Sequence, residues 1–414
     1  MIRLRTLTIN QFPNVAPGTT LNFGRQTILL GKNGSGKTTL LRIISMCLSS
    51  DISEIEEDFD IEFQVDFQSN SGAISANVHA KKTSQGFGQQ DLFSELLDES
   101  FKKLWAEVSF SLDGKQYIVQ IDGAQIEVKC DGETIAGRIT QYPHDRFPLF
   151  RALLAVKSNS DHVILRNMAT ATSAMNRELH RYDESLETFD QIVADEIHII
   201  IAQVENKSKL FWDLVPKNIA TDIKNKSLFG KPDQNISIHS EDCNFLSKLV
   251  RTIGFKSATL STDLISKNTA KKLLQYGNFH FTFELHNGNI ISHNELSYGQ
   301  KRLLAFFWYL ECNKYCIVAD ELVNGLHHDW IAQAMEGIGE KRQAFLSSQN
   351  PLLLDYLTFE SEQDAKNTFV ICDLDDKHQM QWRNLSDSEA HSFYKAYESG
   401  FQHVGEILRT KGLW

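Results

Sequence analysis

The start of the chain changes from strand-like to helix-like spacing of apolar positions. Residues 3–9 alternate polar and apolar side chains, and residues 20–30 combine alternation with a short apolar run, which predicts strands in both places. A glycine-rich turn follows, and residues 38–48 then carry apolar side chains at helical spacing. The predicted order of elements is therefore strand, glycine loop and helix.

The next part of the chain predicts an antiparallel β region. Between residues 61 and 130, short segments alternate apolar and polar side chains. The pairs Asp113-Gly114 and Asp122-Gly123 separate the last segments, and such pairs favour the tight turns of β-hairpins. We therefore expect a lobe built from hairpins.

The middle of the chain predicts helices. Residues 145–277 show longer apolar periodicity, most clearly over 178–212. No heptad pattern persists over the length that a coiled coil needs, so a long coiled-coil arm is not expected. The polar stretch 224–242 contains Gly230 and Pro232 and predicts an exposed loop.

Strand and helix signals alternate after residue 279, which is typical of an α/β fold. Strands are expected at 279–285, 289–291, 344–347 and 368–372 and before Asp320, and helices over 301–311 and from Asp387 onward. The predicted fold class is α/β: a head formed by residues 1–60 and 279–414, an antiparallel β lobe at 61–144 and a mainly helical insertion at 145–278.

Composition narrows the class of protein. The chain has 414 residues, of which 42% are hydrophobic and 23% charged, as in ordinary globular proteins. Its longest apolar stretches, such as 303–310, are far shorter than the roughly 20 residues of a membrane span, and Met1 to Asn10 lacks the apolar core of a secretory signal. The six cysteines are scattered and predict buried thiols. We expect a cytoplasmic protein with no membrane partner.

The strongest chemical signal lies at residues 31–38, which match the phosphate-loop pattern G-x-x-x-x-G-K-[ST]. Glycines let successive backbone N–H groups turn toward phosphate oxygens, and the N-terminus of the following helix adds positive potential. Lys37 is expected to neutralise β- and γ-phosphate charge, and the Thr38 hydroxyl to bind Mg²⁺. The predicted ATP-binding residues of this loop are Asn33, Gly34, Ser35, Gly36, Lys37, Thr38 and Thr39.

A second signal is the apolar strand from Tyr315 to Ala319, which ends in Asp320 and Glu321. Open α/β sheets bind ligands at the carboxyl ends of their strands. Asp320 is expected to hold Mg²⁺, directly or through water, and Glu321 to act as the general base that polarises the attacking water. An apolar strand that ends in two acids is common by itself, so this interpretation depends on the phosphate loop.

A third motif, Leu296-Ser297-Tyr298-Gly299-Gln300, precedes the helix over 301–311. By itself it marks a helix start with Ser297 as the N-cap. In this position before the acidic strand it resembles the signature motif of ABC ATPases, usually written LSGGQ. Together, the three motifs resemble the SMC/RecF-like branch of these ATPases, which includes ATPase subunits of bacterial antiphage systems such as Septu, PARIS and some retrons.

Other segments carry the same resemblance, namely Met1 to Phe12, residues 321–327 and the tail from Tyr394 to Trp414. The resemblance implies a P-loop ABC-type ATPase head that uses ATP and Mg²⁺. In such a head dimer Ser297, Gly299 and Gln300 of one copy would reach the γ-phosphate of ATP held by the other copy, and Asn324 to Leu326 would be the D-loop that crosses to the partner. A homodimer, or a higher oligomer, is the implied assembly.

One position departs from the family pattern. Where the family usually has Thr-His-Ser-Pro, this chain has residues 348–351, Ser-Gln-Asn-Pro. Gln349 thus takes the place of the switch histidine, and glutamine can hydrogen-bond the γ-phosphate or the water but carries no positive charge. Slow turnover is expected, and simple substitution with retained function is the alternative. The Mg²⁺-binding glutamine of the Q-loop stays open among Gln64, Gln68 and Gln141, with Gln141 preferred because these families often place the β lobe before that loop.

The resemblance leaves two functions open and argues against a third. The first is a defence ATPase that senses a trigger or gates a separate effector, commonly a nuclease, which the compact insertion and the altered switch position favour. The second is a DNA-repair or DNA-structure ATPase like RecF. The net charge of −11 argues against it, but an acidic total does not exclude a local basic groove, so a nucleic-acid partner stays open. The third, a transporter subunit, is disfavoured by the long interval between Lys37 and Ser297.

Overall fold

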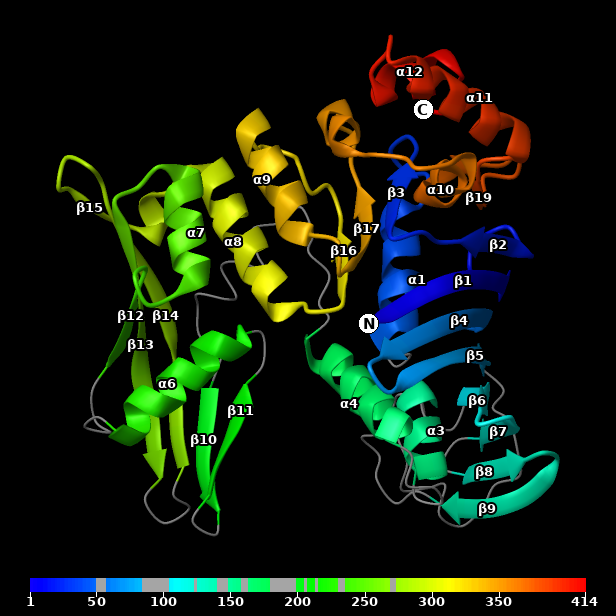
Figure 1. The fold of residues 1–414 in the computed structure, drawn as a ribbon, viewed down its shortest axis with the longest axis horizontal. Helices are drawn as coiled ribbons and strands as arrows, with labels where there is room; N and C mark the ends of the chain where they lie inside the picture. Colours follow the sequence, from blue (N-terminus) through cyan, green and yellow to red (C-terminus); the bar gives the residue numbers. More distant parts are fainter. Residues whose placement is uncertain are drawn as a thin grey trace. The chain divides into compact units, whose positions relative to one another are not determined.

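The computed structural model describes residues 1–49, 57–83, 104–122, 125–139, 148–157, 163–178, 199–204, 207–212, 215–229, 235–268 and 273–414. They belong to two compact units, which Figure 1 colours along the sequence. Unit 1 comprises Met1–Arg181, Tyr315–Asp320 and Glu340–Trp414, and unit 2 comprises Tyr182–Lys314 and Glu321–Gly339.

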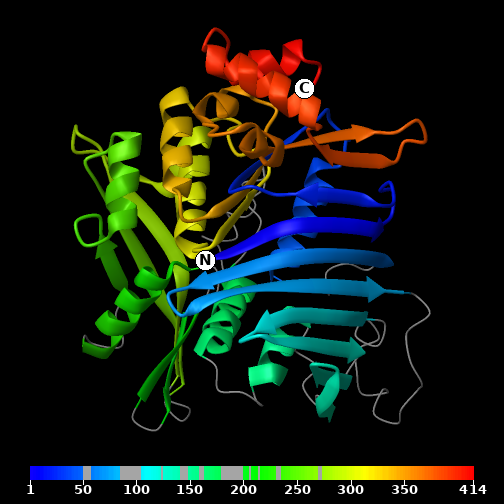
Figure 2. The same ribbon diagram turned by 45° about the vertical axis from the view of Figure 1, so that its right-hand side comes forward.

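Unit 1 contains an antiparallel sheet of eight strands in the order β2-β1-β4-β5-β6-β7-β8-β9. Figure 2 shows these strands side by side, from blue to cyan. Buried and exposed positions alternate along β4, which buries Ile61, Phe63 and Val65, so one face of the sheet is apolar and the other polar. The strand bounds are β1 Ile2–Gln11, β2 Thr19–Asn22, β4 Phe59–Ser69, β5 Gly72–Lys82, β6 Leu104–Leu112, β7 Lys115–Asp122, β8 Gln125–Cys130 and β9 Glu133–Ile139.

The other sheet of unit 1 has five strands in the order β16-β17-β3-β18-β19. The strands β16, β17, β3 and β18 are parallel, and β19 is antiparallel to β18. The carboxyl ends of the parallel strands therefore lie along one edge, where α/β sheets bind ligands. The bounds are β3 Gln26–Leu30, β16 Cys316–Ala319, β17 Gln343–Ser347, β18 Phe369–Leu374 and β19 Met380–Asn384.

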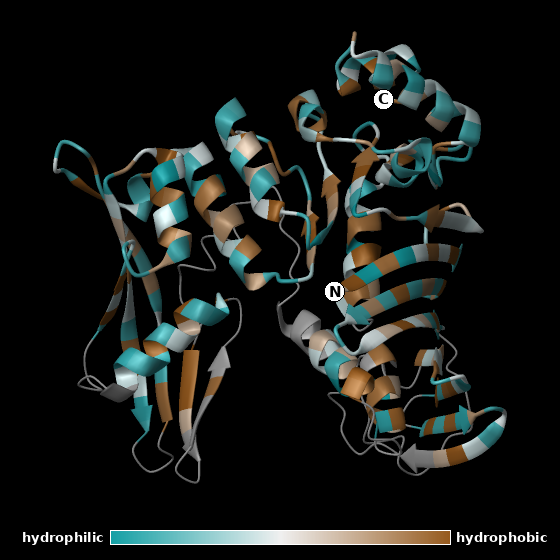
Figure 3. Cartoon of the chain, in the orientation of Figure 1, coloured by the Kyte–Doolittle hydropathy of each residue, from teal (hydrophilic) through white to brown (hydrophobic). Residues whose placement is uncertain are grey.

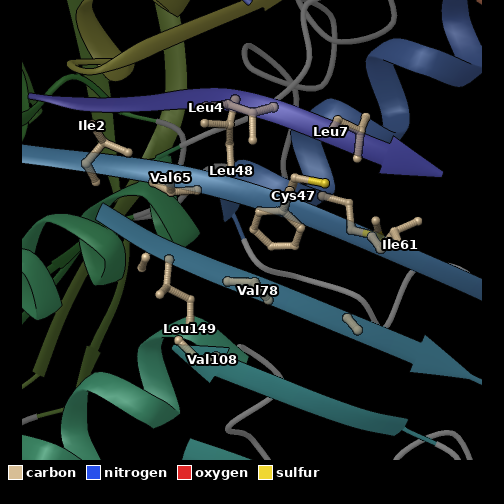
Figure 4. Close-up of a cluster of buried hydrophobic side chains, with 14 of the residues drawn as sticks. Ile2, Leu4, Leu7, Cys47, Leu48, Ile61, Val65, Val78, Val108 and Leu149 are labelled. Atoms are coloured by element: carbon tan, nitrogen blue, oxygen red, sulfur yellow. The ribbon is translucent and has the colours of Figure 1, made fainter. Parts of the chain in front are cut away.

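Helix α1 (Lys37–Ser49) starts at the end of the glycine turn after β3 and supplies apolar side chains to the core of unit 1. Most of its side chains are buried, and Figure 3 shows the helix coloured mainly as hydrophobic. In Figure 4, Cys47 and Leu48 of α1 lie among side chains of the large sheet such as Leu4 and Ile61. Burial of one leucine or isoleucine contributes about 1.5–3 kcal/mol, so this packing firmly anchors the helix that carries the phosphate loop.

The described residues of unit 1 contain six further helical segments. Helix α3 contacts β6, β7 and β8, whereas α4 contacts β4, β5 and α1. Helix α11 begins with a capping box, in which the Glu389 carboxylate accepts from the Ser386 N–H at 2.7 Å and the Glu389 N–H donates to the Ser386 hydroxyl at 3.3 Å. The bounds are α3 Pro148–Lys157, α4 Val163–Glu178, η3 Pro351–Tyr356, α10 Glu362–Thr368, α11 Asp387–Ser399 and α12 Val404–Thr410.

Two side-chain amides join the sheets of unit 1. Gln343, fully buried at the start of β17, accepts from the Leu4 N–H and donates to the carbonyls of Leu4 and Gly24, each at 2.8 Å. Asn384 of β19 accepts from the Asn22 N–H at 2.8 Å and donates to the Asn22 carbonyl at 2.9 Å. These amides satisfy backbone groups of β1 and β2, and a buried group left without a partner costs about 1–3 kcal/mol.

Unit 2 contains an antiparallel sheet in the order β11-β10-β14-β13-β12, with β15 paired to β14. Trp308 of α8 lies 5.7–5.8 Å, between ring centroids, from Phe245 of α7 and from Phe279 and Phe281 of β14. This aromatic cluster holds α8 against the sheet. The bounds are β10 Ile199–Val204, β11 Lys207–Trp212, β12 Ile236–His239, β13 Ser257–Asn268, β14 Leu273–Glu284, β15 Ile290–Ser292, α6 Lys217–Phe229, α7 Asn244–Ile253, η2 His293–Glu295, α8 Tyr298–Cys312 and α9 His328–Ile338.

The segment 145–278, expected to be a mainly helical insertion, contains strands as well as helices. The helices α3, α4, α6 and α7 lie there, but so do β10 to β13 and the start of β14. The helix expected over 178–212 is wrong at β10 and β11. A short apolar run such as Ile199 to Ile201 does not distinguish helix from strand, and its β-branched side chains pack well on a sheet. The loop expected at 224–242 is also partly wrong, because α6 continues to Phe229 and β12 follows.

The antiparallel β lobe expected at 61–144 is confirmed in its strands, but it does not form a separate sheet. Strand β4 pairs with β1, for example Ile61 with Ile9, so the lobe continues the sheet that the first strand begins. Strand β9 adds a hairpin partner for β8 that the sequence pattern did not predict. The division of the chain at residues 60, 144 and 278 stays a prediction.

Candidate functional site

The phosphate loop of unit 1 connects β3 to α1. Gly34 and Gly36 have φ angles of 81° and 83°, left-handed values that glycine adopts without steric cost. The Lys37 ammonium, on a residue that is 7% exposed, donates to the carbonyls of Gly31 and Lys32 at 2.8 and 3.0 Å. The Lys37 ammonium thus lies against its own loop. It could donate to phosphate oxygens in place of these two carbonyls when a phosphate is bound.

Two strands support the loop closely. A Cβ atom at Gly31 would lie 2.2 Å from a backbone carbonyl of β18, and one at Gly36 would lie 2.2 Å from the sulfur of Met380 on β19. The Trp382 indole N–H donates to the Ser35 carbonyl at 3.1 Å. Glycine is therefore required at both positions, and Met380 and Trp382 shape the loop although no sequence signal marked them.

Asp320 follows β16 and is 7% exposed, and both of its carboxylate oxygens accept hydrogen bonds. Thr38 Oγ1 donates to Oδ2 at 2.5 Å, and the hydroxyl of Ser347, at the end of β17, donates to Oδ1. Thr38 and Asp320 are 282 positions apart in the sequence. The fold thus brings together two of the residues for which the sequence predicted a role at Mg²⁺.

These two groups fit a magnesium ion. Mg²⁺ prefers oxygen ligands and usually takes one or two from the protein together with phosphate oxygens and water. Thr38 Oγ1 and the Asp320 carboxylate form such a set beside the phosphate loop. Gln141, the preferred Q-loop residue, lies outside the described residues, and the alternatives Gln64 and Gln68 lie on β4.

Glu321 follows Asp320 in the chain and belongs to unit 2. Its φ angle of 50° is left-handed, which is uncommon for a residue with a side chain and is retained only where the surroundings enforce it. Nη2 of Arg302 donates to its carbonyl at 2.7 Å, and Nδ2 of Asn324 donates to its carboxylate at 3.1 Å. The predicted general base is 6% exposed and held through both its backbone and its side chain.

The motif at 296–300 begins helix α8 with a complete capping box. The Ser297 hydroxyl accepts from the Gln300 N–H at 3.4 Å, and the Gln300 side chain accepts from the Ser297 N–H at 2.8 Å. Ser297 is exposed at the positive end of this helix. The Ser297 hydroxyl and the helix N-terminus could therefore bind an anion. The Gln300 side chain closes the capping box.

The remaining residues of this motif pack on the predicted D-loop within unit 2. A Cβ atom at Gly299 would lie 2.7 Å from the Gly325 carbonyl, and one at Gly325 would lie 2.6 Å from the Tyr298 ring. The Tyr298 hydroxyl accepts from Arg302 Nη1 at 3.4 Å. The start of α8 and the segment 324–326 therefore form one packed group, in which both glycines are needed for close approach.

Gln349 follows β17 and is exposed. The turn around it is well defined, because the Asn350 N–H donates to the Ser348 hydroxyl at 2.9 Å and the Asn350 side chain accepts from the Leu352 N–H at 3.0 Å. Asp320 follows the neighbouring parallel strand β16. Gln349, at the predicted switch position, and Asp320 therefore both follow the carboxyl ends of neighbouring parallel strands, at the same edge of the sheet.

The buried thiols expected from the sequence are confirmed for five of the six cysteines, and Cys130 is partly exposed. Burial raises the pKa of Cys372 to about 12, with a smaller opposing effect from Lys37, so this thiol beside the loop stays protonated. One group of possible metal ligands in the described residues is Asp60, Glu62 and His79. The ammonium of Lys81 lies 2.9 Å from Asp60 and already supplies positive charge there.

Unit 1 places Lys37, Thr38, Asp320 and Gln349 at the carboxyl edge of one sheet. Asn33 is exposed on the loop and Thr39 lies in the first turn of α1. Glu321, Ser297, Gly299 and Gln300 lie in unit 2. Ser347 was missed by the sequence analysis, although a hydroxyl at the end of an otherwise apolar strand, beside a strand that ends in an acid, is a usable signal.

The family model AAA_23, described as an AAA domain, matches residues 6–276. The Retron Vc95 probable ATPase of Vibrio cholerae serotype O1 biovar El Tor is 26% identical over 449 residues, covering 98% of this chain and 82% of that protein. None of the described helices has the length and apolar character needed to span a bilayer.

Solved structures with a similar course of the chain include SMC heads. The SMC head domain from Thermotoga maritima has a TM-score of 0.43 and 10% identity, covering 93% of this chain and 99% of that chain. The Smc head domain from Pyrococcus furiosus, with an extended coiled coil and bound to the C-terminal domain of ScpA, has a TM-score of 0.40 and 11% identity, covering 96% and 100%.

Proposed function

The chain belongs to the AAA_23 family of AAA domains, which confirms the predicted resemblance to SMC/RecF-like ABC ATPases, and from this premise we propose that it is a Mg²⁺-dependent ATPase switch. Two copies dimerise around ATP and gate a separate effector in antiphage defence. The effector that fits this role is a nuclease encoded beside the ATPase.

The observation that carries the proposal is the hydrogen bond of 2.5 Å between Thr38 and Asp320. It joins the phosphate loop to the acidic strand at the edge where α/β sheets bind ligands. Thr38 and Asp320 hold the magnesium ion, which neutralises triphosphate charge, and Lys37 binds the β- and γ-phosphates. Glu321 accepts a proton from the attacking water, and Gln349 hydrogen-bonds the γ-phosphate or that water.

The dimer is supported by the start of α8. Its exposed Ser297 and its helix N-terminus form an anion-binding end, and the γ-phosphate held by a second copy is a fitting ligand for it. The defence role is supported by the relative whose name is Retron Vc95 probable ATPase. Gating of an effector accords with a glutamine at the switch position, which favours a long-lived ATP state.

The experiment combines hydrolysis, assembly and partner identification. The purified chain is expected to hydrolyse ATP only with Mg²⁺ and to form dimers with ATP in analytical ultracentrifugation. Purification from the native host is expected to bring down a nuclease. Failure to bind ATP contradicts the ATPase assignment, whereas duplex-stimulated turnover without a nuclease partner favours the DNA-repair alternative.

Replacement of Gln349 by histidine is expected to speed hydrolysis by roughly 5–10-fold. An imidazolium donates a charge-assisted hydrogen bond, which is worth about 1 kcal/mol more than the neutral bond of glutamine. The measurement is kcat for Mg·ATP hydrolysis by Gln349→His. Gln402→His, at an exposed glutamine between α11 and α12, is the matched control and should leave kcat unchanged. A kcat of Gln349→His at or below that of the wild type would show that Gln349 does not slow turnover.

A further inference from the structure

We propose that Ser347 is a positioning residue for the magnesium site, an inference that rests on the proposed function. Its hydroxyl donates to Oδ1 of Asp320 and holds the carboxylate in the orientation that binds the ion. The residue touches neither nucleotide nor metal in this role. It acts through Asp320.

The surroundings of Ser347 explain why its hydroxyl needs a hydrogen-bond partner. The residue is fully buried at the end of β17, after Phe345 and Leu346, which are also fully buried. It is paired with Leu29 of β3 on one side, and β16 runs parallel on the other. Burying a hydroxyl in such an apolar sheet costs free energy unless it makes a hydrogen bond, and the Asp320 carboxylate accepts that bond.

Two donors on opposite oxygens fix the rotation of the carboxylate. The terminal torsion of an aspartate is otherwise soft and roughly two-fold. Thr38, from α1, binds Oδ2, and Ser347, from β17, binds Oδ1. Thr38 is also the predicted metal ligand, whereas Ser347 contributes to the site by orienting the carboxylate. Loss of such a supporting partner typically costs about 10–100-fold in metal affinity.

Activity by itself does not isolate this role, because Ser347 lies two positions before Gln349 on the same strand end. The decisive measurement is direct metal binding. Mn²⁺ is titrated into the full chain with saturating ADP, and free Mn²⁺ is followed by electron paramagnetic resonance. Ser347→Ala is expected to raise the Kd for Mn²⁺ about tenfold or more, whereas Ser347→Thr, which keeps the hydroxyl, should remain close to wild type.

Thr27→Val is the matched control. Thr27 is fully buried on β3 of the same sheet, and its hydroxyl has no hydrogen-bond partner among the described residues. Its replacement also removes one buried hydroxyl, at nearly constant volume, but far less is lost because no partner is left unsatisfied. The Kd for Mn²⁺ of this variant should equal that of the wild type.

The outcomes separate this inference from the proposed function. If the wild type binds ADP and Mn²⁺, and Ser347→Ala binds Mn²⁺ equally well, the positioning role is wrong and the ATPase assignment stands. If Ser347→Ala does not fold, as judged by circular dichroism, Ser347→Cys replaces it, since a thiol of similar size is a weak donor and should also raise the Kd. A wild type that binds no nucleotide overturns both proposals.

Discussion

Replacement of Lys37 by alanine is expected to weaken ATP binding strongly. The ammonium is nearly buried and lies over the phosphate loop, 2.8 and 3.0 Å from two loop carbonyls. Without it, the charge of the bound triphosphate is left unpaired at this point, which costs about 3–5 kcal/mol. We expect the Kd for ATP to rise by roughly 10²–10⁴-fold, measured by isothermal titration calorimetry.

Lys341→Ala is the control for this loss of positive charge. Lys341 is exposed ahead of β17, at the amino end of that strand, whereas the phosphate loop follows the carboxyl end of β3. A surface charge at that distance is screened by salt, so the Kd for ATP should stay near the wild-type value. An unchanged Kd in Lys37→Ala would remove the lysine from the phosphate site.

Replacement of Glu321 by glutamine is expected to separate binding from hydrolysis. Glutamine keeps the size of the side chain and an oxygen that accepts from Asn324, which lies 3.1 Å away in the native pair, so the fold should persist. The amide does not accept a proton at neutral pH, and a general base contributes about 10²–10⁴-fold to the rate. We expect kcat to fall by this factor while the Kd for ATP remains near wild type.

The ATP-bound dimer should then accumulate, because ATP hydrolysis is too slow to let the two copies dissociate. Size-exclusion chromatography with light scattering, in the presence of Mg·ATP, reports the dimer fraction of Glu321→Gln against the wild type. Glu336→Gln, at an exposed position of α9, carries the same charge change and should behave as wild type. Wild-type turnover in Glu321→Gln would exclude this residue as the base.

Several elements could be predicted because their signals are local. The phosphate loop needs glycines at Gly34 and Gly36, where φ is left-handed, and that need is visible in the residues themselves. The starts of α8 and α11 are marked by a serine followed three positions later by a side chain that closes the capping box. Hairpin turns such as the one at Asp113 and Gly114, both with positive φ, are marked in the same way.

Other features of the fold could not be predicted, because the contacts that decide them join residues that are remote in sequence. Residues 20–30 were predicted as strand throughout, yet β2 belongs to the eight-stranded sheet and β3 to the five-stranded sheet. Which sheet each strand joins depends on partners such as Leu21 with Leu7 and Thr27 with Phe345. Strands β10 and β11 were predicted as helix for a related reason, since β10 pairs with the remote strand β14 as well as with β11.

The sequence by itself determined the chemistry at the phosphate loop and the order of the elements that carry it, because backbone angles, caps and apolar periodicity act over a few residues. Only the tertiary structure decided which side chains meet. Thr38 reaches Asp320 across 282 positions, Gln343 reaches Leu4 across 339, and Ser347 was recognised at Asp320 only once β17 lay beside β16. The physical reason is that hydrogen bonds and packing depend on proximity in space, which chain-local patterns do not encode.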